Sequence, residues 1–122
     1  MSVGELIERK KVCSRYGAEF FDVDPDLTVG IALNVRDGLL PVNGLRLKPE
    51  GTATGWFIWA GESSSEADDF YQPLHASHIA EWSPLISKYL GLPPGWRFLV
   101  TPDYEDVWFD PELLKVLPLE GM

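Results

Sequence analysis

The sequence has a single cysteine, no long apolar run and few basic residues in its C-terminal part. Because Cys13 is the only cysteine among 122 residues, an internal disulfide bond is excluded, and chains of this kind are typical of reducing compartments. We therefore expect a cytoplasmic protein. Cys13 follows Val12 in a segment with helical periodicity, which favours a small buried apolar side chain over a reactive nucleophile.

No apolar run approaches the ~20 residues that a membrane-spanning helix needs. Charges are scattered through residues 1–16, where a secretion signal would have an uninterrupted apolar segment. Neither a low-complexity tract nor an internal repeat is visible. A composition of 45% hydrophobic and 24% charged residues is that of a folded chain, and we expect one domain over residues 1–122.

Basic residues are scarce where acidic and aromatic residues are concentrated. From Gly51 onward there are three basic and eleven acidic residues, whereas the first fifty residues carry seven and eight. All five tryptophans lie in the same part, between Trp56 and Trp108. An anionic surface attracts a cationic partner, and tryptophan and tyrosine add contact area at low entropic cost. The pattern predicts a protein-binding surface and argues against nucleic acid or membranes as direct partners.

Apolar runs bounded by turn residues predict strands. Residues 56–60 are all apolar and lie between Gly55 and Gly61, which suits a central strand covered on both faces. Further strands are expected at residues 27–35, 45–47, 96–100 and 107–109, with a short extended piece at 20–23. A turn at Thr101-Pro102-Asp103 joins the last two strands.

Helical spacing of apolar residues predicts short helices. Residues 4–16 form one helix that ends before Gly17. Residues 79–90 are also helical in spacing, but Ser83-Pro84 is a good start for a second helix, so two short helices with a bend are expected there. A last short helix is expected at residues 111–116. This order of elements predicts an α+β single domain, a mainly antiparallel sheet with short helices packed on it.

His75 and His78 are the sharpest catalytic candidates. Residues three apart at a helix start share a face and could hold a metal ion with Glu62 or Asp69 as third ligand. A zinc site of this type needs a closely specified third ligand, and apolar neighbours of the pair indicate packing. We therefore expect structural or interfacial histidines, no metal ion, no cofactor and no catalytic residue.

Two acidic clusters, residues 62–69 and 103–110, fall in expected loops. Adjacent carboxylates in polar loops seldom provide the two different environments that a general acid and base require. We interpret them as partner-facing, forming one anionic patch if both loops lie at the same end of the sheet. The expected partner-binding residues are Glu62, Asp68, Asp69, Tyr104, Glu105, Asp106 and Trp108.

The aromatic residues divide into core and surface candidates. Trp56 and Trp59 are three apart on a strand and face opposite sides, so one of them is expected in the core. Trp82 lies on the apolar stripe of its helix and is also expected in the core. Tyr104 and Trp108 lie among acids near a turn, which is typical of surface anchors.

Three segments resemble a family of bacterial immunity proteins. They are Gly55-Trp56-Phe57-Ile58-Trp59-Ala60-Gly61-Glu62, then Asp69-Phe70 with Gln72-Pro73-Leu74-His75, then Tyr89-Leu90-Gly91-Leu92-Pro93-Pro94-Gly95-Trp96-Arg97-Phe98. The family is immunity protein 33 of polymorphic toxin systems, long described as a domain of unknown function, and the similarity covers about residues 29–114. It implies a cytosolic protein that binds and neutralises a cognate toxin, with no catalytic residues to carry over.

The leading interpretation is therefore a non-catalytic immunity protein that binds a cognate toxin with a basic surface through its own acidic, aromatic-rich surface. Electrostatic steering, which raises association rates by ~10–10³, suits an inhibitor that must capture a toxin quickly. Two alternatives stay open. One is a small metal-dependent hydrolase that uses His75 and His78, and the other is a regulatory protein-interaction domain unrelated to toxins.

Overall fold

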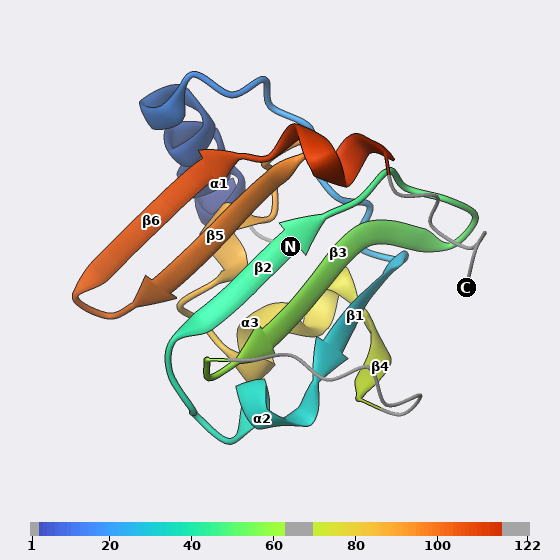
Figure 1. Cartoon of the computed structure of the whole chain (residues 1–122), viewed down its shortest axis with the longest axis vertical. Helices are drawn as coiled ribbons and strands as arrows, with labels where there is room; N and C mark the ends of the chain where they lie inside the picture. Colours follow the sequence, from blue (N-terminus) through green and yellow to red (C-terminus); the bar gives the residue numbers. More distant parts are fainter. Residues whose placement is uncertain (1–2, 63–69, 116–122) are drawn as a thin grey trace.

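The computed structural model describes residues 3–62 and 70–115, which form one six-stranded sheet with helices packed against it (Figure 1). In chain order the elements are α1 (Val3–Tyr16), β1 (Thr28–Ala32), α2 (Leu33–Arg36), β2 (Val42–Arg46), β3 (Ala53–Ala60), β4 (Tyr71–His75), the 3-10 helix η1 (Ala76–His78), α3 (Ile79–Trp82), the 3-10 helix η2 (Ser87–Tyr89), β5 (Trp96–Thr101), β6 (Tyr104–Phe109) and the 3-10 helix η3 (Pro111–Lys115). Within the described residues, no helix has the length and apolar character needed to cross a bilayer.

The sheet is mixed, and its strand order is β4-β1-β3-β2-β5-β6. β1 and β3 run parallel, and the other four neighbouring pairs are antiparallel. β3 lies in the interior between β1 and β2, as its apolar run between two glycines predicted. The predicted α+β class with a mainly antiparallel sheet is confirmed.

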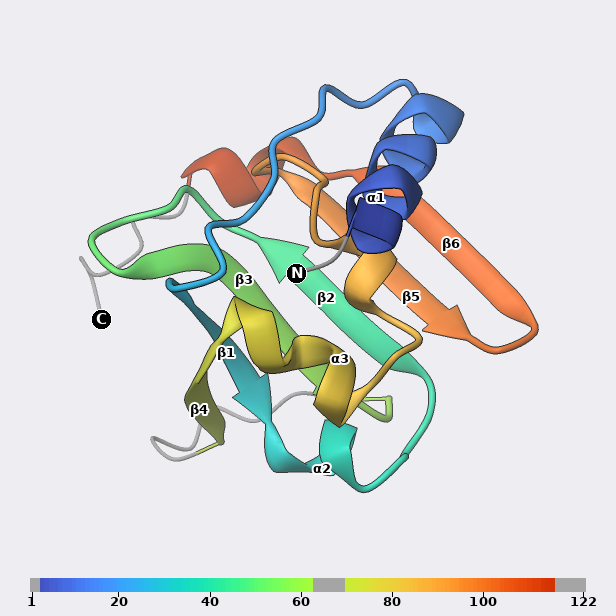
Figure 2. The same cartoon turned by 180° about the vertical axis from the view of Figure 1, so that it is seen from behind.

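The two sides of the sheet differ in what covers them. α1 and α3 lie behind the strands in Figure 1 and in front of them in Figure 2, so both pack on the same side. We call this side the helix face and the opposite side the open face. Because side chains alternate along a strand, neighbouring residues of each strand belong to different faces.

The main core lies between the helices and the helix face. Ile58 at the centre of β3 is 0% exposed and Phe98 on β5 is 1% exposed. Gly44 on β2 pairs with both residues, and a Cβ there would overlap the Phe98 ring. The absence of a side chain at this position therefore makes room for an aromatic ring across the middle of the sheet.

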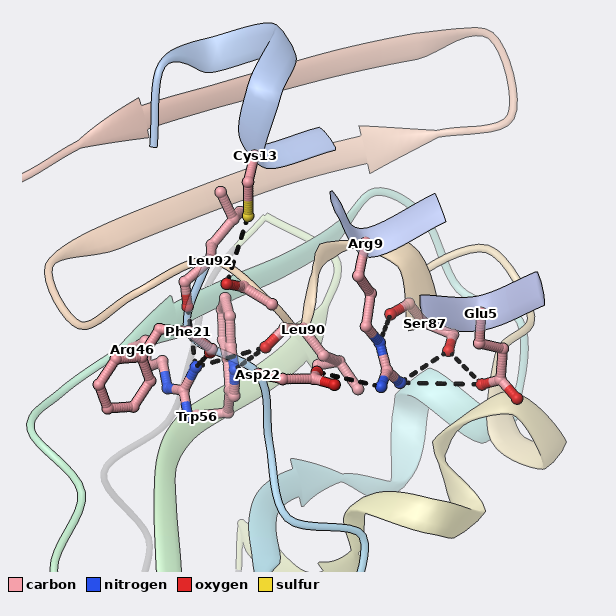
Figure 3. Close-up of polar contacts among 11 residues, drawn as sticks. Glu5, Arg9, Cys13, Phe21, Asp22, Arg46, Trp56, Ser87, Leu90 and Leu92 are labelled. Carbon is pink, nitrogen blue, oxygen red and sulfur yellow. Dashed lines mark hydrogen bonds and ion pairs between the residues drawn. The ribbon is translucent and has the colours of Figure 1, made fainter. Parts of the chain in front are cut away.

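A buried arginine ties two loops to the sheet (Figure 3). Arg46 on β2 is 2% exposed, and burial lowers the pKa of its guanidinium to about 10, which leaves it protonated at neutral pH. Its guanidinium lies 5.0 Å from the Phe21 ring centroid and 5.7 Å from that of Trp56. Its nitrogens donate to the backbone carbonyls of Thr54 (3.0 Å), Phe21 (2.6 Å), Leu90 (3.3 Å) and Leu92 (2.9 Å). One cation thus satisfies carbonyls from three separate chain segments.

A second buried arginine joins α1 to the segment around η2 (Figure 3). Arg9 is 1% exposed. It donates from Nε to the Ser87 carbonyl at 2.9 Å and from Nη2 to Ser87 Oγ at 3.1 Å. Its Nη1 also lies 3.2 Å from Asp22 Oδ1. Since a buried charge is costly unless it is paired and hydrogen-bonded, these contacts allow α1 to bury a face that carries an arginine.

The structure corrects several boundaries expected from the sequence. The strand expected at 27–35 ends at Ala32, because the Asn34 side chain turns back to bond the backbone of Ala60, accepting from its N–H at 3.0 Å and donating to its carbonyl at 2.9 Å. β2 begins three residues earlier than expected, and β4 was not predicted at all. Residues 20–23 form no strand.

The prediction that a second helix begins at Ser83-Pro84 is wrong. Ser83 instead ends α3 as its C-terminal cap, and the next helical turn is η2, which begins only at Ser87. The expected loop at 103–110 is also wrong, since β6 already starts at Tyr104. A two-residue turn therefore joins β5 and β6, and its position at Pro102-Asp103 agrees with the predicted turn.

Three tryptophans occupy different environments. Trp56 belongs to the main core and is 1% exposed, which confirms that one of the pair on β3 is in the core. Trp59 faces the other way, yet it too is nearly buried, at 8% exposure. Trp82 is half-buried and packs against the main core. Buried side chains therefore lie on both faces of β3, in agreement with the predicted central strand.

Candidate partner-binding surface

Glu62 and the β5–β6 turn lie at the same end of the sheet. Val42 pairs with Ala60 on one side and with Val100 on the other, and Val100 pairs in turn with Glu105. These residues form one row across four strands. Exposed Glu62 follows the β3 end of this row, and the β5–β6 turn with exposed Asp103 follows its other end. Asp68 and Asp69 lie outside the described residues, so their role stays a prediction.

Alternation along β6 divides the predicted binding residues between the two faces of the sheet. Glu105 contacts α1 and therefore lies on the helix face. Tyr104, Asp106 and Trp108 consequently point to the open face. Tyr104 is 56% exposed, Asp106 is exposed and Trp108 is half-buried. The structure thus brings three predicted residues together on one face and separates Glu105 from them.

Glu105 is held by three donors from other parts of the chain. Its Oε1 accepts a hydrogen bond from the Tyr89 hydroxyl at 2.6 Å. Its Oε2 accepts from the Tyr16 hydroxyl and from Arg15 Nη1, the latter at 2.6 Å. Together these contacts connect the C-terminal end of α1 and the end of η2 to β6.

The electrostatics of this cluster keep Glu105 ionised. Burial alone would raise the pKa of Glu105, but the Tyr16 and Tyr89 hydroxyls and the Arg15 guanidinium outweigh it and lower the pKa to about 2. Burial and the nearby carboxylate raise the pKa of both tyrosines. A carboxylate that is satisfied and ionised in this way suits a structural contact better than proton transfer at neutral pH.

Sequence reasoning missed the three residues that hold Glu105. Arg15 and Tyr16 close the first helix, and Tyr89 was part of an apolar helical stripe, so nothing in their local pattern indicated a shared partner. The contacts join residues 16 to 90 positions apart. Only the tertiary fold brings them together.

Trp108 does not stand free on the open face. The Arg97 guanidinium lies 5.7 Å from its ring centroid, and Arg97 Nη1 lies 3.2 Å from Asp110 Oδ2. Arg97 therefore already pairs with two residues of its own chain. By contrast, Asp103 and Asp106 form no ion pair with any described residue. Their charges remain available to a cationic partner.

Two cavities lie on the helix face rather than beside the histidines. One of about 480 Å³ is lined by Gly4, Glu5, Glu8, Pro84, Ser87 and Lys88. The other, of about 240 Å³, adjoins the β5–β6 turn and is lined by Leu85, Lys88, Tyr89, Thr101, Pro102, Asp103, Tyr104 and Glu105. The second is smaller than typical small-molecule pockets of ~300–1,000 Å³.

His75 and His78 do not share a helix face, because His75 is the last residue of β4. Their ring centroids are 6.2 Å apart, and His78 Nδ1 lies 2.9 Å from Glu81 Oε2. Over residues 3–62 and 70–115, no three metal-ligating side chains cluster. One proposed third ligand, Asp69, lies outside that range. The expectation that the chain binds no metal ion stays a prediction.

Comparison with known proteins gives one match. The model of a family described as the Imm33-like domain matches residues 8–110. No curated protein and no solved structure matches the chain. The match includes residues 8–16 of α1, all six strands and the four residues of the Glu105 cluster.

Proposed function

The chain belongs to the Imm33-like family, and from this premise we propose that it is a non-catalytic immunity protein that binds and neutralises a cognate bacterial toxin domain in the cytoplasm. The observation that carries the proposal is the family match over residues 8–110. The surface that we assign to toxin binding comprises the exposed acids at one end of the sheet and the β6 side chains of the open face. Its described members are Glu62, Asp103, Tyr104, Asp106 and Trp108.

Charge and exposure support this surface. The chain has a net charge of −9, and Asp103 and Asp106 are exposed carboxylates without a described ion pair. Exposed Tyr104 adds a large amphipathic side chain beside them. Free carboxylates around an aromatic residue attract a basic surface at long range and give it contact area at short range. We assign Glu105 a supporting role, since it fixes β6 against α1.

The chemistry of the described residues supports binding rather than catalysis. Glu105 is ionised and fully hydrogen-bonded, and Cys13 is buried with its Sγ 3.3 Å from the Gly91 carbonyl. Burial also raises the pKa of the Cys13 thiol, which opposes formation of a nucleophilic thiolate. The two histidines are exposed at the end of β4 and in η1, away from both cavities.

The proposal predicts that a gene next to that of this chain encodes the cognate toxin domain, and this domain is the probe for the test. We expect the wild-type chain to bind the purified domain and to restore growth of cells that express it. Asp106→Lys should weaken binding by about tenfold or more, because it places a like charge against a basic surface. Glu50→Lys is the matched control, since it makes the same charge change at an exposed site before β3, at the opposite end of that strand.

Equal affinities of the wild type and both variants would exclude the acidic surface while leaving toxin binding intact. A wild-type chain that neither binds the toxin nor restores growth would contradict the immunity function itself and favour a regulatory interaction domain.

A further inference from the structure

The two edges of the sheet differ in their capacity to pair with another strand. β4 forms one edge, has five residues and contains Pro73, which has no N–H to donate. β6 forms the other edge, has six residues and contains neither proline nor lysine. Its register with β5 is continuous from Tyr104 to Phe109. β6 therefore lacks the proline, lysine or bulge by which edge strands commonly avoid pairing.

The hairpin geometry identifies the backbone groups that β6 presents outward. Thr101 and Tyr104 pair across a turn of two residues, so they exchange backbone hydrogen bonds and bonded pairs alternate from there. The N–H and C=O groups of Glu105, Val107 and Phe109 consequently point away from β5. In the described part of the chain no backbone group bonds to them.

The side chains of β6 add contact area at both ends of this edge. Tyr104 is 56% exposed on the open face, and Phe109 is 46% exposed on the helix face. Between them, Asp106 presents a carboxylate without a described ion pair. A strand laid along β6 would therefore meet an aromatic side chain at each end and a negative charge near the middle.

We propose that the β6 edge pairs with an extended, basic segment of the toxin, which adds a seventh strand to the sheet. This inference rests on the proposed immunity function and names the part of the surface that makes main-chain contact. A lysine or arginine opposite Asp106 would form a favourable cross-strand pair. Main-chain hydrogen bonds would supply affinity, and the Asp106 charge would select a basic strand.

Charge favours a basic partner over a second copy of this chain. Two copies joined through β6 would bring two acidic edges together, each from a chain with a net charge of −9. Like charges near one another across paired strands are destabilising. A basic toxin segment removes this repulsion and replaces it with attraction.

Phe109→Pro tests the main-chain contact in the full chain. Proline at this position removes an N–H that points outward and spares the bonds between β5 and β6, and the preceding residue is already extended. The matched control is Phe109→Ala, which removes the same aromatic ring but retains the N–H. With the purified toxin domain as the probe, we expect Phe109→Pro to weaken binding by about tenfold relative to Phe109→Ala.

Amide hydrogen exchange on the wild-type chain gives an independent readout if Phe109→Pro fails to fold. In the free chain the amides of Glu105, Val107 and Phe109 should exchange faster than those of Tyr104, Asp106 and Trp108, which bond to β5. Binding of the toxin domain should protect the first set at least tenfold.

The outcomes separate this inference from the immunity function. If the wild type binds the toxin while both Phe109 variants bind equally and the outward amides stay unprotected, the edge pairing is wrong and the immunity function stands. If the wild type does not bind the toxin, both fail. Protection of the outward amides without toxin, together with a dimer in sedimentation, would assign the edge to a second copy and overturn the proposal.

Discussion

At the scale of single residues, Glu105 has a structural role although it is acidic and follows exposed Tyr104 and precedes exposed Asp106. It accepts hydrogen bonds from Arg15, Tyr16 and Tyr89 on the helix face. Its neighbour Asp106 in the sequence points to the opposite face of the sheet, so the two carboxylates have different roles despite being adjacent. The charge pattern alone could not distinguish them, because the three donors to Glu105 come from α1 and η2. Period-two alternation along β6, once the strand was recognised, would have separated them.

Glu105→Gln tests this role through its pH dependence. The pKa of Glu105 is about 2 in the folded chain against an ordinary value of 4.5, so ionisation stabilises the fold above about pH 4.5, and this stabilisation is lost as the pH falls toward about 2. Because the cluster reaches the surface and solvent screens it, we expect Glu105→Gln to lower the free energy of unfolding by about 1–2 kcal/mol at pH 7.

The difference between wild type and Glu105→Gln should shrink between about pH 4.5 and pH 2 in urea denaturation measured across this range. Glu112→Gln is the control, since it makes the same charge change at an exposed position. If Glu105→Gln lost no more stability than the control at pH 7, the cluster would not stabilise the fold.

At the scale of elements, the sequence predicted the helix, strand and turn limits that are set by a glycine or proline at the limit itself. α1 ends before Gly17, β3 ends before Gly61, and the β5–β6 turn falls at its proline, whereas β3 begins at Ala53, three residues before its predicted start. Gly61 illustrates the local control, because it follows the last residue of β3 and its φ of 90° favours glycine. These signals are readable without knowing what else packs nearby.

Elements fixed by distant contacts could not be predicted. The parallel pairing of β1 with β3 and the return of the Asn34 side chain to Ala60 depend on the tertiary fold. β4 contains Pro73, which argues against a strand in sequence terms, and it is tolerated because β4 is an edge. The partner-binding role of the β6 residues stays a prediction, and their division between two faces of the sheet was not predicted.

Ile58→Asp tests the central position of β3. Ile58 is 0% exposed and lies between β1 and β2, so the variant buries a carboxylate without a partner. We expect a loss of at least ~4 kcal/mol, which is a large share of the ~5–15 kcal/mol that stabilises an ordinary domain. The control Ile58→Val removes one methyl group and should cost ~0.5–1.5 kcal/mol. A melting temperature of Ile58→Asp close to that of Ile58→Val would contradict the buried central strand.

At the scale of the whole molecule, charge and topology act together. Nearly all of the excess negative charge follows Gly51, and the fold brings the β3 end and the β5–β6 turn to the same end of the sheet. We therefore expect the exposed acids at this end, Glu62, Asp103 and Asp106, to give the protein a directional field. Such a field orients a basic partner before contact, which makes the association rate the sensitive quantity.

We therefore expect the rate of association with the neighbouring toxin domain to fall by about tenfold or more as ionic strength rises from about 0.01 M to 1 M, over which the Debye length falls from about 30 Å to 3 Å. The dissociation rate should change far less, because short-range contacts at β6 govern it.

Stopped-flow measurements on the wild type, Asp106→Lys and Glu50→Lys resolve the origin of the effect. Asp106→Lys should associate more slowly and with a weaker dependence on salt, whereas Glu50→Lys, with the same net charge, should resemble the wild type. An association rate that is indifferent to salt in all three chains would exclude steering, and identical slopes for the two variants would assign it to net charge rather than to the end of the sheet that carries Asp106.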